Sequence, residues 1–322
     1  MPYFGGKSRA AEEIWKRLGD VKNYVEPFCG SLAIPLARPH DPGIETVNDK
    51  DRFIANFWRA LQAEPDAVAH HADWPVNEAD LESRHYWLVS EGAKRLSALM
   101  ADPGGHDAKI AGWWVWGQCC WIGSGWCSGN GPWSVGPDGW VRNAGQGINR
   151  QLPHLRNAGQ GINRQLPHLG DAGKGIREYL NQIACRIRRI RVCCGDWSRV
   201  LTPSVTFRHG MTGVVLDPPY GEGEVDYSAG GNADNGIAED AARWALTNGE
   251  NPDLRIALCG YEGQFDMPES WFCFAWKAAG GYSATAFGNS AAKSNRHRER
   301  IWFSPHCIPA KCELPESLLI PA

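Results

Sequence analysis

Val214-Val215-Leu216-Asp217-Pro218-Pro219-Tyr220 is the stretch on which the predicted fold depends. Its first three residues are apolar, as in a strand buried within a parallel sheet. A carboxylate, two prolines and an aromatic ring follow, so we expect the strand to end at Asp217. Each proline fixes its own φ and lacks a backbone donor, which leaves the carbonyl groups of Asp217 and Pro218 free to accept hydrogen bonds.

The same stretch predicts a binding site for a planar ring that bears an amino group. The amino group would donate to the Asp217 carboxylate and the Pro218 carbonyl, while the ring lies on the face of Tyr220. Such a pocket suits a nucleobase. The alternative is that the turn merely ends a strand and Tyr220 packs elsewhere, and only the context of so short a motif can decide between the two.

The overall composition is that of a globular protein with reduced thiols. The chain has 322 residues, 43% of them apolar and 21% charged, with a net charge of −3. This length suits one large domain with an insertion, or two domains. The eleven cysteines include the adjacent pairs Cys119-Cys120 and Cys193-Cys194 but no Cys-x-x-Cys, so neither a disulfide framework nor a metal site is indicated. Without a signal peptide or a long apolar run, we expect a cytoplasmic location and no membrane contact.

The N-terminal part predicts a strand, a turn and a helix around a cofactor. Gly5-Gly6-Lys7 precedes an amphipathic pattern over 9–18, which places one ammonium at a helix start where an anionic group could bind. Glu26 then ends an apolar strand, and Gly30 opens the turn into a short helix over 32–36. Because Gly30 is not part of a Gly-x-Gly-x-x-Gly pattern, a pyrophosphate is a poorer match than a cationic cofactor with an amino group.

The next strand is predicted over 44–49 and ends in Asp49, about twenty residues after the glycine turn. An acidic residue at this place can accept hydrogen bonds from both hydroxyls of a ribose. Asp51 is a near alternative for that role. Asp49 could instead cap the helix expected over 52–62.

Five further strands complete the predicted sheet, at 187–194, 213–216, 254–259, 272–276 and 300–303, with a helix over 238–246. The seven strands, mostly separated by helices, predict an α/β fold with a twisted, largely parallel sheet. Ligands bind such sheets at the carboxyl ends of the strands. The acidic residues expected at those ends are Glu26, Asp49, Asp196 and Asp217.

The middle of the chain, from about Trp74 to Leu180, lacks the periodicity of an α/β sheet. Seven of the sixteen tryptophans fall between Trp113 and Trp140, where they could provide stacking faces or form a compact aromatic core. Residues 142–155 and 156–169 are identical copies, which we interpret as a recent duplication in a tolerant surface loop. Over 142–191, nine Arg and one Lys oppose two acidic residues, an excess that predicts phosphate contacts from one face.

Together these residues resemble the Dam-type family of DNA adenine-N6 methyltransferases, the D12 class or alpha group, in which the cofactor motif precedes the target-recognition region. The resemblance covers roughly 1–75 and 185–305. The motifs that carry it, in chain order, are Tyr3 to Lys7, Glu26 to Ser31, Asn48-Asp49, Cys194-Gly195-Asp196 and Asp217 to Tyr220. A late Asn295-Arg296-x-x-Glu299 is similar to the family's closing motif.

The resemblance implies a Rossmann-like methyltransferase domain with a seven-stranded sheet, formed by 1–75 and 185–310, with an inserted target-recognition region at 76–184 and a tail at 311–322. It further implies S-adenosylmethionine as methyl donor and a flipped-out adenine in duplex DNA as acceptor. The implied cofactor residues are Tyr3, Lys7, Glu26, Phe28, Gly30, Asp49 and Asp196, and the implied acceptor residues are Asp217, Pro218, Pro219 and Tyr220. The basic candidates for DNA contact are Arg142, Arg150, Arg156, Arg164 and Lys174.

Several alternatives stay open from the residues alone. The pocket at Asp217 could hold cytosine N4, an RNA base or a protein amide, and an inactive DNA-binding relative is a further alternative. A nicotinamide dehydrogenase is disfavoured by the lone Gly30. The family more often has Asp where this chain has Glu26, and the middle of the chain has no counterpart, so the recognition sequence is open. A homodimer would suit a palindromic target, and a paired restriction enzyme is neither indicated nor excluded.

Overall fold

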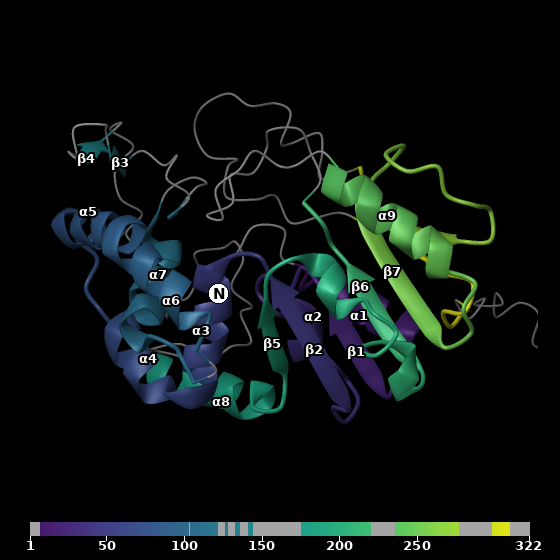
Figure 1. Ribbon diagram of the computed structural model, residues 1–322, viewed down its shortest axis with the longest axis horizontal. Helices are drawn as coiled ribbons and strands as arrows, with labels where there is room; N and C mark the ends of the chain where they lie inside the picture. The colour runs from purple at the N-terminus through teal and green to yellow at the C-terminus, as the bar shows by residue number, and fades with distance from the viewer. Residues whose placement is uncertain are drawn as a thin grey trace, which may run out of the picture.

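A seven-stranded sheet forms the centre of the computed structural model (Figure 1). The structure describes residues 7–102, 104–121, 126–127, 133–135, 141–143, 175–219, 236–276 and 298–309, with backbone only for 133–135 and 141–143. The strands of the sheet are β1 (Asn23–Glu26), β2 (Ile44–Asp49), β5 (Arg191–Cys194), β6 (Thr212–Leu216), β7 (Leu254–Tyr261), β8 (Phe272–Ala275) and β9 (Glu299–Phe303). In the sheet their order is β5-β2-β1-β6-β7-β9-β8.

The pairing of these strands confirms the predicted α/β fold. From β5 to β7 every neighbouring pair is parallel, whereas β9 runs antiparallel to both β7 and β8. The chain builds outward from β1 through β2 to β5 on one side, and from β6 to β7 on the other. The order therefore reverses between β1 and β6, and in doubly wound sheets ligands bind at the carboxyl ends of the strands at such a point.

Alternating side chains of the central strands pack against helices on the two faces of the sheet. Val215 of β6 shares one buried cluster with α1 (Ala11–Leu18). Its neighbour Val214 belongs to a different cluster, which includes α9 (Gly236–Asn248). Successive residues of a strand point to opposite faces, so β6 is buried on both sides, as its apolar run predicts.

A group of helices gathers beside the edge of the sheet formed by β5 (Figure 1). These are α3 (Arg52–Ala63), α4 (Pro65–Ala72), α5 (Glu78–Trp87), the π-helical turn η1 (Leu88–Gly92), α6 (Ala93–Leu99), α7 (Ala108–Cys120) and α8 (Ile176–Ile187). Short polar side chains start three of them: Asp51, Asn77 and Asp107 each accept a hydrogen bond from a backbone N–H of the first turn.

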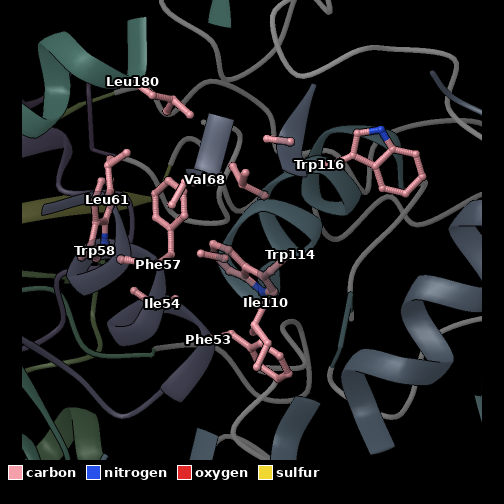
Figure 2. Packing of buried hydrophobic residues seen from close by; sticks show 14 of the residues in the cluster. Phe53, Ile54, Phe57, Trp58, Leu61, Val68, Ile110, Trp114, Trp116 and Leu180 are labelled. Atoms are coloured by element: carbon pink, nitrogen blue, oxygen red, sulfur yellow. The ribbon is translucent and has the colours of Figure 1, made fainter. Parts of the chain in front are cut away.

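These helices share one aromatic-rich core, in which the ring of Phe57 of α3 contacts the rings of Trp58 of α3 and Trp114 of α7 (Figure 2). Trp114, Trp116, Trp121 and Trp126 are all buried. For these four tryptophans the compact aromatic core, rather than an open stacking face, is confirmed. Within the described part of the chain, no helix combines the length and the apolar character needed to cross a membrane.

Most predicted elements agree with the structure to within two residues, but the strand predicted over 187–194 is wrong at its start. Ile187 is the last residue of α8, and β5 begins only at Arg191. Ile187 is fully buried in the helical core, and its carbonyl accepts a hydrogen bond from the Ile190 N–H, which closes the turn between helix and strand. Apart from the backbone of 142–143, which lies in the short hairpin of β3 (Trp133–Val135) and β4 (Val141–Asn143), the tandem repeat lies outside the described residues.

Candidate active site

The acidic residues predicted at strand ends do lie at one edge of the sheet. Glu26 is the last residue of β1, Asp49 is the last residue of β2, and Asp217 directly follows β6. Asp196 lies two residues beyond β5. Since β5, β2, β1 and β6 are mutually parallel, their carboxyl ends meet at the same edge. This edge includes the point between β1 and β6 where the strand order reverses.

The acceptor motif begins where β6 leaves the core. Val214, Val215 and Leu216 have no exposed surface, while the Asp217 side chain is 15% exposed. Pro218 is buried and Pro219 half-buried. The strand thus ends at Asp217 as the sequence predicts, and its carboxylate reaches the edge of the sheet. Tyr220 lies outside the described residues.

Lys7 contacts the acceptor motif directly. Its ammonium Nζ lies 2.9 Å from Asp217 Oδ1 and 3.6 Å from Glu299 Oε2, and its side chain is only 4% exposed. Lys7 therefore brings a buried positive charge to the carboxylate predicted to bind the acceptor. The resemblance placed Lys7 among the cofactor residues; its contacts join it to Asp217. Tyr3, from the same motif, lies outside the described residues.

Glu26 is a deeply buried carboxylate at this edge, with 3% of the residue exposed. Burial raises its pKa well above the ordinary value; a hydrogen bond from the Tyr24 hydroxyl to Oε2, at 3.0 Å, opposes the shift, and the negative charge of Asp217 adds to it. A raised pKa means that burial favours the neutral form of the Glu26 carboxyl group. A positive charge nearby would favour the ionised form. The site is therefore suited to a cationic ligand.

The glycine turn and Asp49 are joined by hydrogen bonds. The Gly30 N–H donates to Asp49 Oδ2 at 3.0 Å, and the Asp51 N–H donates to Oδ1 at 2.9 Å. Gly30 has φ 42°, a conformation that favours glycine. Burial, with the negative charge of Asp51, raises the pKa of Asp49 to about 7, although its backbone hydrogen bonds act in the opposite direction.

Asp49 and Asp51 have different roles, which resolves an ambiguity in the sequence. The helix α3 is capped by Asp51, whose Oδ1 accepts from the Phe53 N–H at 2.8 Å. Asp49 is therefore not the cap of this helix. Its carboxylate faces the glycine turn between β1 and α2 (Ala33–Leu36) instead.

An aromatic pair lies beside the carboxylates. Phe28 and Trp197 are stacked, with ring centroids 5.8 Å apart and an interplanar angle of 28°. Buried Asn48 holds the two loops that carry them, because its Nδ2 donates to the carbonyls of Pro27 and Gly195, each at 3.0 Å. Trp197 was not among the predicted site residues, although its place directly after Asp196 at a strand end is the signal that could have identified it.

Asp196 is exposed and hydrogen-bonded locally. Its Oδ1 accepts from the backbone N–H and the hydroxyl of Ser198, and the hydroxyl contact lowers the pKa of the carboxyl group. Asp196 therefore stays ionised next to Trp197. This arrangement can accept hydrogen bonds from a ligand that lies against the aromatic pair.

The basic middle of the chain is only partly described. The side chain of Arg142 and the whole of Arg150, Arg156, Arg164 and Lys174 lie outside the described residues, so their DNA contacts stay a prediction. Arg186, which contributes to the local positive excess, pairs with buried Glu45 through two contacts of 2.8 and 2.9 Å. Part of the excess charge is thus used inside the fold.

A comparison with protein families matches part of the chain. No curated protein matches the chain. A family model described as the D12 class of N6 adenine-specific DNA methyltransferases matches residues 3–97, the part of the chain that contains Lys7, Glu26, Phe28, Gly30 and Asp49. The mixed sheet described above is consistent with the Rossmann-like fold that the resemblance implies. Over residues 3–97 this chain is therefore similar to the D12 class of N6 adenine-specific DNA methyltransferases, the family that its motifs resemble.

Proposed function

We propose that this protein transfers a methyl group from S-adenosylmethionine to N6 of an adenine flipped out of duplex DNA. The observation that carries the proposal is the Asp217 carboxylate, which buried β6 presents at the reversal of strand order, 2.9 Å from the Lys7 ammonium. The match of residues 3–97 to DNA adenine methyltransferases supports the choice of substrate.

The described residues suit S-adenosylmethionine in charge and in the types of groups that they present. Asp49 presents a carboxylate at the end of β2, where it could accept hydrogen bonds from ribose hydroxyls. Phe28 and Trp197 could hold an adenine ring, with Asp196 beside it. Glu26 would supply a carboxylate for the amino group of the cofactor. When bound, this cofactor supplies an electrophilic methyl group.

Asp217 and Pro218 would prepare the acceptor nitrogen. An exocyclic amino group is a poor nucleophile because its lone pair is delocalised into the ring. If the Asp217 carboxylate and the Pro218 carbonyl accept its two hydrogens, a pyramidal nitrogen is favoured and the lone pair becomes available for in-line attack. Positioning and electrostatics would then carry the step, without a strong base. The methyl–sulfur bond would break as the nitrogen–methyl bond forms, with S-adenosylhomocysteine as leaving group, and N6 would lose one proton afterwards.

Access to the nitrogen requires the base to leave the helix. Flipping costs a few kcal/mol, and stacking on Tyr220 could return about 1 to 3 kcal/mol of this cost. Contacts to the DNA backbone are assigned to the basic middle of the chain, with Arg142, Arg150, Arg156, Arg164 and Lys174 as candidates.

The test is transfer of labelled methyl from S-adenosylmethionine to unmethylated duplex DNA, followed by nucleoside analysis of the digest. We expect N6-methyladenine as the labelled product. N4-methylcytosine would keep the mechanism and change the base. No label in DNA, together with measurable cofactor binding, would contradict the proposal and direct attention to RNA or protein acceptors.

A further inference from the structure

Glu299 contacts the site through Lys7, although the reaction outlined above does not use it. The Lys7 ammonium lies between two carboxylates, Asp217 at 2.9 Å and Glu299 at 3.6 Å. All three side chains are largely buried, with 4%, 15% and 14% of their surface exposed. The ring of Trp276 lies 5.7 Å from the same ammonium.

The topology of the sheet brings these three residues together from distant parts of the chain. Lys7 stands just before α1, and its carbonyl accepts the backbone N–H groups of Ala10 and Ala11. Asp217 follows the parallel strand β6. Glu299 is the first residue of β9, which pairs antiparallel to β7 with Glu299 opposite Tyr261. An antiparallel strand begins at the edge where its parallel neighbours end, so Glu299 arrives beside Asp217.

We propose that Glu299 is a positioning residue that acts through Lys7 to set the orientation and the charge of Asp217. This inference rests on the methyltransferase function proposed above. A lysine ammonium is a compact charge on a flexible chain, with three donors that rotate freely. A second carboxylate 3.6 Å from the ammonium limits that freedom, so that the ammonium holds Asp217 Oδ1 in one orientation toward the amino group.

The charge of Glu299 also matters for the strength of Asp217 as an acceptor. A single ammonium beside a single buried carboxylate withdraws electron density from it and weakens its other hydrogen bonds. When two carboxylates share the ammonium, each is pulled less strongly. Loss of the Glu299 charge therefore leaves Lys7 paired more tightly with Asp217, and the acceptor nitrogen is held less well.

The test is the rate of methyl transfer to duplex DNA under single-turnover conditions, measured together with the affinity for S-adenosylhomocysteine. We expect Glu299→Gln to slow transfer by about 10- to 100-fold, as for a small misplacement of a reacting group. Affinity for S-adenosylhomocysteine and the melting temperature should stay close to those of the wild type. Glu299→Asp should restore part of the rate. Glu262→Gln removes an exposed carboxylate just beyond the end of β7 and is the matched control.

A double variant tests whether the effect passes through Lys7. If it does, Lys7→Met with Glu299→Gln is no slower than Lys7→Met alone. The inference would be overturned if the rate losses of the two single variants multiplied in the double variant. It would also be overturned by a Glu299→Gln rate within twofold of the wild type, or by a rate loss that weaker cofactor binding explains. A wild-type protein that transfers no methyl group to DNA would instead overturn the proposed function, and the inference with it.

Discussion

The edge of the sheet and the helical region beside it handle buried polar groups in opposite ways. At the sheet edge, carboxylates are surrounded by donors: Gly30 and Asp51 donate to Asp49, and Lys7 lies against Asp217. In the helical region, polar side chains are surrounded by aromatic rings. The donors at the sheet edge favour the ionised form of Asp49 and so oppose the effect of burial on its pKa. In the helical region, polar atoms are removed from water among aromatic rings.

Two neighbouring residues of α5 show the second arrangement. The Arg84 guanidinium lies over the rings of Trp74, Trp113 and Trp116, at 4.9, 5.1 and 4.4 Å from their centroids. The His85 ring contacts the rings of Trp121 and Trp126, and its Nε2 has no hydrogen-bond partner. Changes at the sheet edge should therefore alter the reaction, and changes in the helical region should alter stability.

The largest effect is expected at Asp217. Asp217→Ala should reduce methyl transfer at least about 1,000-fold. Removal of one preorganised group that stabilises developing charge typically costs 10²- to 10³-fold. In this protein the variant also loses the group that orients the acceptor. Affinity for S-adenosylhomocysteine should change little. Initial rates and calorimetric binding separate the two effects. The control is Asp253→Ala. Asp253 is exposed and directly precedes β7, at the edge of the sheet opposite the candidate site. Near-normal turnover of Asp217→Ala would contradict the proposed role.

The next largest effect is expected at Trp114, in the core of the helical region (Figure 2). Trp114→Ala should lower the free energy of unfolding by about 3 to 5 kcal/mol, because it opens a large cavity in a packed core. Denaturant unfolding followed by circular dichroism measures this change. Trp74 is 43% exposed, and Trp74→Ala should cost much less. Equal losses for both variants would show that the aromatic core is not the source of stability here.

His85 gives the helical region a dependence on pH. Burial lowers the pKa of His85 to about 4. At pH values between about 4 and the ordinary pKa of histidine, His85 binds a proton in the unfolded chain but not in the folded chain. The free energy of unfolding therefore falls as the pH drops through this range, by up to about 3 kcal/mol. His85→Leu should flatten the dependence of the unfolding free energy between pH 7 and pH 4.5.

The same contrast explains which parts of the fold the sequence can predict. The buried strand β6 ends in an apolar run, and Asp217 with the two prolines directly after it marks its limit. The helix α7 is buried on several sides, and its residues are apolar around most of its circumference. It therefore shows no amphipathic period and was not predicted. Ile187 and Ile190 fit both a helix face and a strand, and only the packing of α8 decides between them.

Within the candidate site, the sequence locates groups along the chain but not their partners. The strand-end positions of Glu26, Asp49 and Asp217 follow from local patterns. The contact of Lys7 with Asp217 and Glu299 depends on how α1 packs on the sheet and on the antiparallel direction of β9, which no local pattern contains. Trp197 joins Phe28 for the same reason, since their loops meet only when β5 and β1 lie in one sheet.

The smallest expected effects separate two carboxylates that are neighbours in sequence. Asp51→Ala removes the cap of α3 and should cost about 1 kcal/mol of stability, with cofactor affinity nearly unchanged. Asp49→Ala should do the reverse and weaken S-adenosylhomocysteine binding. Ribose hydroxyls donate best to an ionised carboxylate, and the pKa of Asp49 is about 7, so wild-type affinity should rise about tenfold from pH 6 to pH 8 as the proton is lost. Calorimetry at both pH values should find this rise in the wild type and not in Asp49→Asn. Persistence of the full pH dependence in Asp49→Asn would assign it to another group and leave Asp49 without the proposed ribose contact.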